Sequence, residues 1–114
     1  MRPLKVTAKF KIKEGNLEAF KAIIPDIIAE VMESDPGTLV YEWFLNEDLM
    51  ECVVWEVYES SEAVIAHSGN VGGYLDQLVN LADFSLELYG NPSEELLGAV
   101  EGLEVRVYPF VDGI

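Results

Sequence analysis

The feature that most constrains this chain is a change of hydrophobic period near its start. From Leu4 to Lys13 every even position is apolar and every odd position is polar, which predicts a strand with one buried face. After Gly15-Asn16 the apolar residues change to helical spacing as far as Glu33, which predicts an amphipathic helix capped by Asn16. A strand that leads directly into such a helix indicates a fold in which helices cover a sheet.

Further strands and helices follow at short intervals, without a repeat or a linker. We predict strands over 38–45, 50–58, 84–89 and 104–108, a helix from 61 to about 78 that Ser60 caps and Gly72-Gly73 interrupts, and a short helix from Pro92 to Val100. The first six elements then have the strand–helix–strand–strand–helix–strand order of ferredoxin-like folds. The sequence therefore predicts one α+β domain over residues 1–114, with a ferredoxin-like core at 4–89 and an added C-terminal helix and strand.

The two central strands are apolar on both faces. In the first, Tyr41 and Trp43 lie on one face and Phe44 on the other; in the second, Val54 and Trp55 face opposite ways. One layer of helices covers only one face, and strands of this kind need cover on both. A second copy of the same sheet is the simplest cover. We therefore expect a homodimer packed sheet to sheet, the alternative being a monomer with scattered exposed apolar residues.

The chain is strongly acidic, and its charges are segregated. It has 7 basic and 21 acidic residues, a net charge of −14, with +4 in residues 1–21 and −18 in residues 22–114. Such a chain repels phosphate backbones and anionic lipid surfaces, so we expect neither a nucleic-acid nor a membrane partner. The single cysteine excludes an intramolecular disulfide framework. Because the first residues lack the apolar core of a signal peptide, we expect a cytoplasmic location.

His67 is the only histidine and the main candidate for acid–base chemistry. Helical spacing places it with Val64 and Val71, toward the sheet. A neutral imidazole there can accept a proton or donate a hydrogen bond; the alternative is a core histidine satisfied by a backbone carbonyl. The aromatic residues of the same region predict either the walls of a small-molecule pocket or ordinary packing. They are Tyr41, Trp43, Trp55 and Tyr74.

Two glutamates, Glu42 and Glu56, lie in otherwise apolar strands. A carboxylate in such a place must be paired, exposed at an edge or shifted to a higher pKa. Arg106, the only base after Lys21, could be the partner in a structural ion pair. The sequence has no spacing typical of a metal site, no glycine-rich phosphate loop and no Gly-x-Ser-x-Gly elbow. We expect no metal and no cofactor.

Several short motifs resemble the antibiotic biosynthesis monooxygenase family in their order and spacing. The motifs are Pro36-Gly37, Tyr41-Glu42, Trp55-Glu56 and Ala63-x-x-x-His67. The resemblance covers about residues 4–89, and residues 90–114 are similar to an extension found in a subset of these proteins. It implies a homodimeric α+β barrel built from ferredoxin-like subunits.

The resemblance also implies a function. The family includes small quinol monooxygenases and haem-degrading oxygenases, and several members oxidise electron-rich aromatic compounds with O₂ without metal or flavin. For this chain it implies a cofactor-independent monooxygenase of a quinol-like or polycyclic aromatic compound, with His67 as the base or phenol-orienting group. Unlike haem-degrading relatives, the first strand has no asparagine and position 57 is valine. The alternatives are a non-catalytic ligand-binding or regulatory dimer and a dimer that binds haem through His67.

Overall fold

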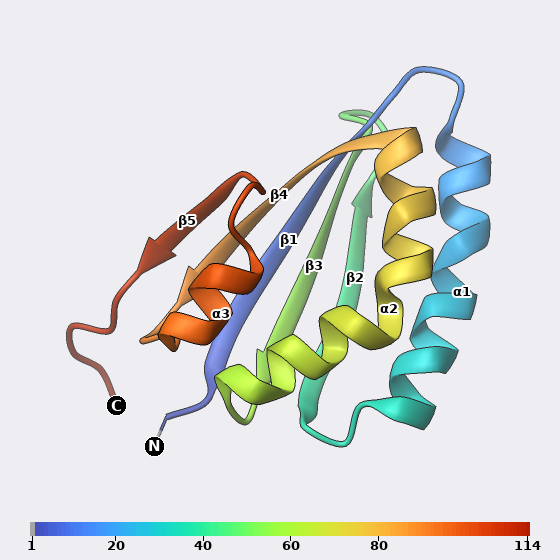
Figure 1. Ribbon diagram of the computed structural model, residues 1–114. Helices are drawn as coiled ribbons and strands as arrows, with labels where there is room; N and C mark the ends of the chain where they lie inside the picture. The colour runs from blue at the N-terminus through green and yellow to red at the C-terminus, as the bar shows by residue number, and fades with distance from the viewer. Residues whose placement is uncertain (1) are drawn as a thin grey trace.

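A computed structural model describes residues 2–114 as one twisted sheet with helices on one side (Figure 1). The sheet has the order β2-β3-β1-β4-β5, and all neighbouring strands are antiparallel except β4 and β5. The βαββαβ core, with β5 added beside β4, confirms the predicted ferredoxin-like α+β fold. The elements are β1 (Leu4–Ile12), α1 (Leu17–Ser34), β2 (Thr38–Asn46), β3 (Glu51–Tyr58), α2 (Ser61–Leu81), β4 (Ala82–Tyr89), α3 (Glu94–Ala99) and β5 (Val105–Tyr108).

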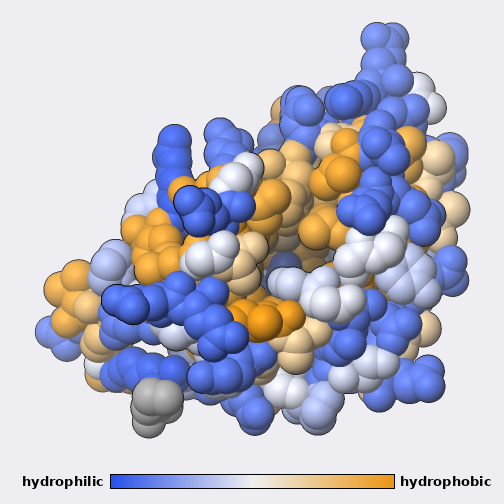
Figure 2. All heavy atoms as spheres, viewed as in Figure 1, coloured by the Kyte–Doolittle hydropathy of each residue, from blue (hydrophilic) through white to orange (hydrophobic). Residues whose placement is uncertain are grey.

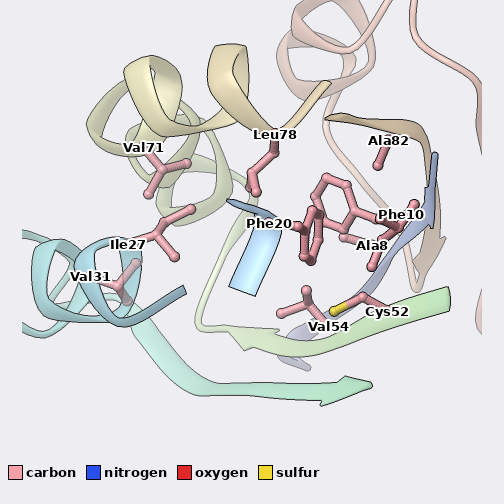
Figure 3. Packing of buried hydrophobic residues seen from close by; sticks show 11 residues of the cluster. Ala8, Phe10, Phe20, Ile27, Val31, Cys52, Val54, Val71, Leu78 and Ala82 are labelled. Atoms are coloured by element: carbon pink, nitrogen blue, oxygen red, sulfur yellow. The ribbon is translucent and has the colours of Figure 1, made fainter. Parts of the chain in front are cut away.

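The main core lies between the sheet and the two long helices, α1 and α2. The even-numbered residues of β1 are all buried, as the period-two alternation predicted. Phe10, near the end of that strand, meets the ring of Phe20 from α1 and the ring of Phe84 from β4, with centroids 5.3 and 4.9 Å away. Figure 3 shows the buried side chains of this cluster between the helices and the sheet, with Val54 and Cys52 of β3 among them. The core thus joins both long helices to the central strands.

The opposite face of the sheet is not covered by any of the described helices (Figure 1). It carries Trp55 and Val57 of β3 and Phe44 of β2, and the Phe44 side chain is 56% exposed. The lysines at odd positions of β1 also lie on this face. The apolar side chains on both faces of the central hairpin were predicted. The helices cover one of these faces, and no described helix covers the other.

The C-terminal extension packs against the end of the same inner face. Leu96 of α3 is fully buried in a second cluster that includes Leu4 of β1, Tyr58 of β3 and Leu88 of β4. The helix begins at Glu94 rather than at Pro92, because the Ser93 hydroxyl caps it by accepting the Leu96 N–H at 3.1 Å. The extension therefore adds to the helical layer as well as to the sheet.

Two other helix ends test the capping predictions. The Ser60 hydroxyl accepts the Ala63 N–H at 3.1 Å, which confirms it as the cap of α2. Asn16 is the N-cap residue of α1 as predicted, but its side chain makes no cap bond to the helix and instead donates to the Leu81 carbonyl at 3.3 Å. Gly72-Gly73 does not divide α2, which is continuous, although its ribbon changes direction along its length (Figure 1). None of the described helices is long and apolar enough to cross a membrane.

Candidate functional site

His67 lies on the buried face of α2, where helical spacing predicted it. The residue is only 7% exposed. Its ring packs between Tyr41 of β2 and Tyr58 of β3, whose ring centroids are 5.2 and 5.3 Å away. Since these contacts fix the imidazole plane, the chemistry of His67 depends on what each ring nitrogen meets.

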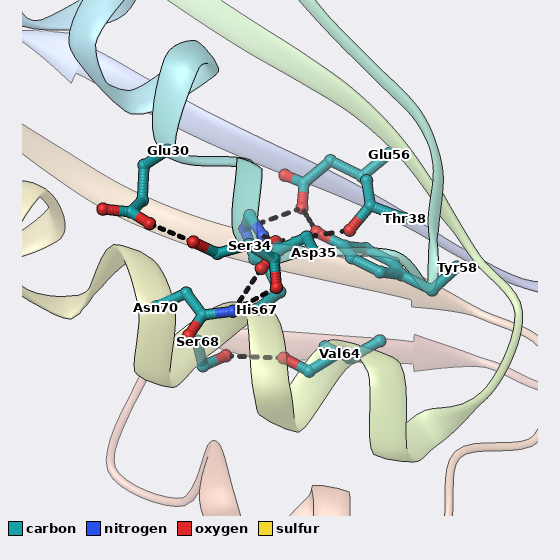
Figure 4. A network of polar contacts seen from close by, with 10 residues as sticks. All are labelled: Glu30, Ser34, Asp35, Thr38, Glu56, Tyr58, Val64, His67, Ser68 and Asn70. Atoms are coloured by element: carbon teal, nitrogen blue, oxygen red, sulfur yellow. Dashed lines mark hydrogen bonds and ion pairs between the residues drawn. The ribbon is translucent and has the colours of Figure 1, made fainter. Parts of the chain in front are cut away.

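A buried carboxylate orients the His67 ring. Asp35, the residue that ends α1, places Oδ2 2.5 Å from His67 Nδ1. The Thr38 hydroxyl donates to the same oxygen at 3.3 Å, and the Asn70 amide, one turn further along α2 than His67, donates to Oδ1 (Figure 4). Both carboxylate oxygens are therefore held in place, and Asp35 is fixed as the acceptor for an N–H of the ring.

The Pro36-Gly37 turn explains how Asp35 reaches α2. A Cβ at Gly37 would lie 2.6 Å from the Cβ of Ala63, so only glycine allows the turn to approach the helix this closely. The Glu59 N–H, at the end of β3, donates to the Gly37 carbonyl at 3.0 Å. The turn is thus held against both β3 and the start of α2, one turn of helix before His67.

Burial keeps the His67 imidazole neutral near neutral pH. Loss of solvation lowers the His67 pKa below its ordinary value of 6.5, and the hydrogen bond and charge of Asp35 oppose that shift. When Nδ1–H donates to Asp35, the neutral ring carries its free lone pair on Nε2. A histidine oriented by a carboxylate at one nitrogen and free at the other has the geometry of a general base.

A second carboxyl group lies on the Nε2 side of the ring. Glu56 is 6% exposed, and its Oε1 is 3.8 Å from His67 Nε2. The Tyr58 hydroxyl donates to the same oxygen. Burial raises the pKa of Glu56 to about 8, against the opposing effect of the Tyr58 hydrogen bond, so the group is mostly a neutral carboxylic acid at pH 7. Asp35, His67, Glu56 and Tyr58 form one polar row between α2 and the sheet (Figure 4).

The row borders an apolar cavity of about 220 Å³ between the sheet and α2. His67 and Glu56 are part of its wall, and the extension supplies Val100 and Leu103 on another side. Figure 2 shows a hollow on this side of the molecule, surrounded by apolar side chains. Because a cavity of about 150 Å³ holds benzene, the volume suits a compound of one or two rings.

The four aromatic residues predicted to bind substrate divide into two pairs. Tyr41 and Trp43 line the cavity, with ring centroids 5.8 Å apart in an edge-to-face arrangement. The indole N–H of Trp43 is buried and has no hydrogen-bond partner within residues 2–114, so it is a free donor for a ligand oxygen. Tyr74 packs at the margin of the core without lining the cavity. Trp55 projects from the opposite face of the sheet, near Tyr89, because it alternates with Glu56.

The expected ion pair of Arg106 with Glu42 or Glu56 is not formed within residues 2–114. Glu56 points to the helices, whereas Arg106 pairs in register with Glu87 of β4, whose side chain is on the other face. Glu42 is exposed and lies on β2, at the sheet edge opposite β5. Glu56 is instead the shifted carboxyl that the sequence left open as an alternative.

Sequence reasoning missed Asp35 and Asn70 as parts of the site. Asp35 lies beside the Pro36-Gly37 motif, and its 32-residue separation from His67 gives no local signal of contact. Asn70 lies three residues after His67 on the same helix, a spacing that places the two side chains near each other. The hydrogen-bond partner of His67 is the Asp35 carboxylate and not a backbone carbonyl, which was the alternative. No three metal-binding side chains of residues 2–114 are grouped to hold an ion.

Comparisons with known structures agree with this architecture. MupZ from Pseudomonas fluorescens superposes with a TM-score of 0.88 at 24% identity, over 100% of this chain and 94% of its own. Rv0793 from Mycobacterium tuberculosis has a TM-score of 0.70 at 23% identity, over 82% of this chain and 98% of its own. SO0527 from Shewanella oneidensis has a TM-score of 0.68 at 24% identity, over 77% and 89% of the two chains. At these sequence identities, the superpositions show that the proteins share a fold.

The sequence itself matches one family. No curated protein sequence is similar enough to the chain to count as a match. The profile of the antibiotic biosynthesis monooxygenase family matches residues 3–72, a segment that contains β1 to β3, the Asp35 turn, Glu56 and His67. The match therefore includes the polar row as well as most of the core. The chain belongs to the antibiotic biosynthesis monooxygenase family.

Proposed function

We propose that this protein is a cofactor-independent monooxygenase that oxidises a one- or two-ring phenol of the quinol type with O₂. The observation that supports it most is the Asp35-oriented His67, whose free Nε2 borders an apolar cavity. A group that removes a phenolic proton needs a free lone pair within reach of the bound ring, and His67 Nε2 meets this requirement. The cavity volume favours a quinol-like compound over the polycyclic alternative.

The chemistry needs little more than a base and a dry pocket. His67 Nε2 takes the phenolic proton, and the resulting phenolate is electron-rich enough to reduce O₂. One oxygen atom enters the ring, the other leaves as water, and the quinol supplies all four electrons as it becomes a hydroxyquinone. Tyr41 and Trp43 hold the ring beside His67, and the apolar walls exclude water from the reactive intermediate.

Oxygen uptake tests this proposal. Protein freed of metals and flavin is mixed with a panel of one- and two-ring quinols, and O₂ consumption is compared with the autoxidation blank. We expect uptake that His67→Ala reduces at least about 100-fold, the scale of general base catalysis. Tyr74→Phe, on the same helix but outside the cavity, should retain it. Quinol binding without O₂ uptake would support the alternative of a non-catalytic binding dimer.

A homodimer packed through the open face of the sheet is part of the proposal. Phe44, Trp55 and Val57 leave an apolar strip there without cover from the described chain, and exposed strips of this kind mark association surfaces. Light scattering should give about twice the 12.7 kDa of one chain. Phe44→Glu should shift the mass toward one chain. A wild-type protein that stays monomeric at micromolar concentration would refute the dimer.

A further inference from the structure

The neighbours of His67 give the site an acid as well as a base. Glu56 Oε1 faces His67 Nε2 at 3.8 Å and accepts from Tyr58, while its other oxygen takes part in none of the hydrogen bonds found within residues 2–114. Both Glu56 and His67 line the cavity. A ligand can therefore touch the lone pair of one group and the carboxyl of the other.

The position of one proton decides what this pair can do. The ionisable groups facing it are Asp35 from the end of α1, Tyr41 from β2 and Tyr58 from β3, and the cavity wall has no lysine or arginine. When the Nδ1–H of His67 is donated to Asp35, one further proton remains for Glu56 and His67 Nε2 to share. The pair forms either a neutral acid and a neutral imidazole or an ion pair with the same net charge. Burial without a cation favours the neutral form, in agreement with the raised Glu56 pKa and the lowered His67 pKa.

We infer that Glu56 and His67 act together as a general acid and a general base, so that the site catalyses keto–enol tautomerisation of a small cyclic ketone without oxygen. His67 Nε2 removes a proton from the carbon beside the carbonyl, and the C–H electron pair becomes the C=C bond of the enol. Glu56 gives its proton to the carbonyl oxygen, which takes up the C=O π pair. Glu56 then regains a proton from His67, so no electron or proton is gained or lost overall.

This activity goes beyond the proposed oxygenation but uses the same cavity. Oxygenation of a phenol needs only a base, whereas tautomerisation needs a donor at the oxygen and an acceptor at the carbon. A neutral acid beside a neutral base provides both at once. Glu56 is thus assigned as a catalytic residue and Asp35 as a positioning residue, because the Asp35 carboxylate bonds to His67, Thr38 and Asn70 and does not line the cavity.

Hydrogen–deuterium exchange under anaerobic conditions tests the inference separately from oxygenation. The probe is 2-tetralone, a two-ring ketone suited to the cavity volume, and NMR in D₂O follows loss of its α-proton signal. We expect exchange at least about 100-fold above the protein-free blank, reduced on the order of 100-fold in both His67→Ala and Glu56→Gln. Glu56→Gln keeps an acceptor for the Tyr58 hydroxyl. Retention of the wild-type fold is checked by circular dichroism.

Two further variants separate catalysis from structure. Glu87→Gln is the matched control, because Glu87 also accepts from a tyrosine two residues away but lies on the open face of the sheet; its exchange rate should equal that of the wild type. Asp35→Asn should lower the rate and alter its pH profile, since the amide no longer fixes Nδ1–H. Wild-type protein that fails to bind 2-tetralone, or binds it without exchange, would overturn the inference. Unchanged exchange in Glu56→Gln would show that Glu56 is not the general acid and would refute that part of the inference. Exchange without O₂ uptake would support tautomerisation while contradicting the proposed oxygenation.

Discussion

Glu56→Gln gives the sharpest test of the buried acid, through stability rather than activity. The folded state raises the Glu56 pKa from 4.5 to about 8 because burial disfavours the carboxylate. Between these two values the folded protein holds one proton more than the unfolded chain. Stability must therefore fall as pH rises, by up to about 1.4 kcal/mol per pH unit. Glutamine has nearly the same shape but does not titrate, so this dependence should disappear in the variant.

The effect of His67 has the opposite sign and a different pH range. Its folded pKa is lowered from 6.5, so the unfolded chain binds more protons below that value and stability rises with pH up to about 6.5. Above pH 6.5 the His67 effect fades, and the comparison with Glu56→Gln isolates the Glu56 effect, because all other groups are common to both proteins. From about pH 6.5 to about pH 8.5, the wild type should lose about 2 kcal/mol relative to Glu56→Gln.

Urea unfolding followed by tryptophan fluorescence measures this difference, at one protein concentration because association would otherwise contribute. A loss of about 2 kcal/mol corresponds to a fall in the wild-type melting temperature, relative to that of Glu56→Gln, on the order of 8 °C between pH 6.5 and pH 8.5. Glu42→Gln removes an exposed carboxyl from the same hairpin, and its difference from the wild type should stay flat. Parallel pH profiles for the wild type and Glu56→Gln would show that Glu56 is not the buried acid described here.

Two other predictions concern stability alone. Leu96→Ala removes a fully buried side chain that joins α3 to the second core cluster and should cost about 2–5 kcal/mol in urea unfolding; a loss below about 1 kcal/mol would mean that the extension is loosely attached. Gly73→Ala should stabilise the protein by about 0.5–1 kcal/mol, because a Cβ there would meet no atom within 4 Å and alanine favours helix. Destabilisation by Gly73→Ala would show that the bend of α2 requires glycine.

The fold was predictable because it follows from periodicity, which is a local property of the sequence. The alternation in β1 and the helical spacing of α1 and α2 each extend over ten or more residues, so the hydrophobic effect alone determines which face is buried. Helix ends were less predictable. The start of α1 after Asn16 was predicted, but the Asn16 side chain bonds to Leu81 and not to the helix. The start of α3 lies after Ser93 and not at Pro92, because the Ser93 hydroxyl caps the helix.

The site was predictable only where it depends on the face of a single element. The burial of His67 and the inward direction of Tyr41 and Trp43 follow from spacing on one helix and one strand. The face of Trp55 depends on the register of β3 against its neighbours, which the sequence did not fix. The partnership of Asp35 with His67 depends on how closely the Gly37 turn approaches α2, a distance that arises only when the whole fold is assembled.

The polar row is itself an argument for function, because the fold does not require it. Glu56 occupies an inward position of β3 between Val54 and Tyr58, where an apolar side chain would complete the core without a titrating group. A carboxyl there destabilises the protein progressively as pH rises through the neutral range. Proteins retain such costly groups mainly where activity depends on them. The same pKa that lowers stability near pH 8 leaves Glu56 able to donate a proton at pH 7, beside a histidine able to accept one.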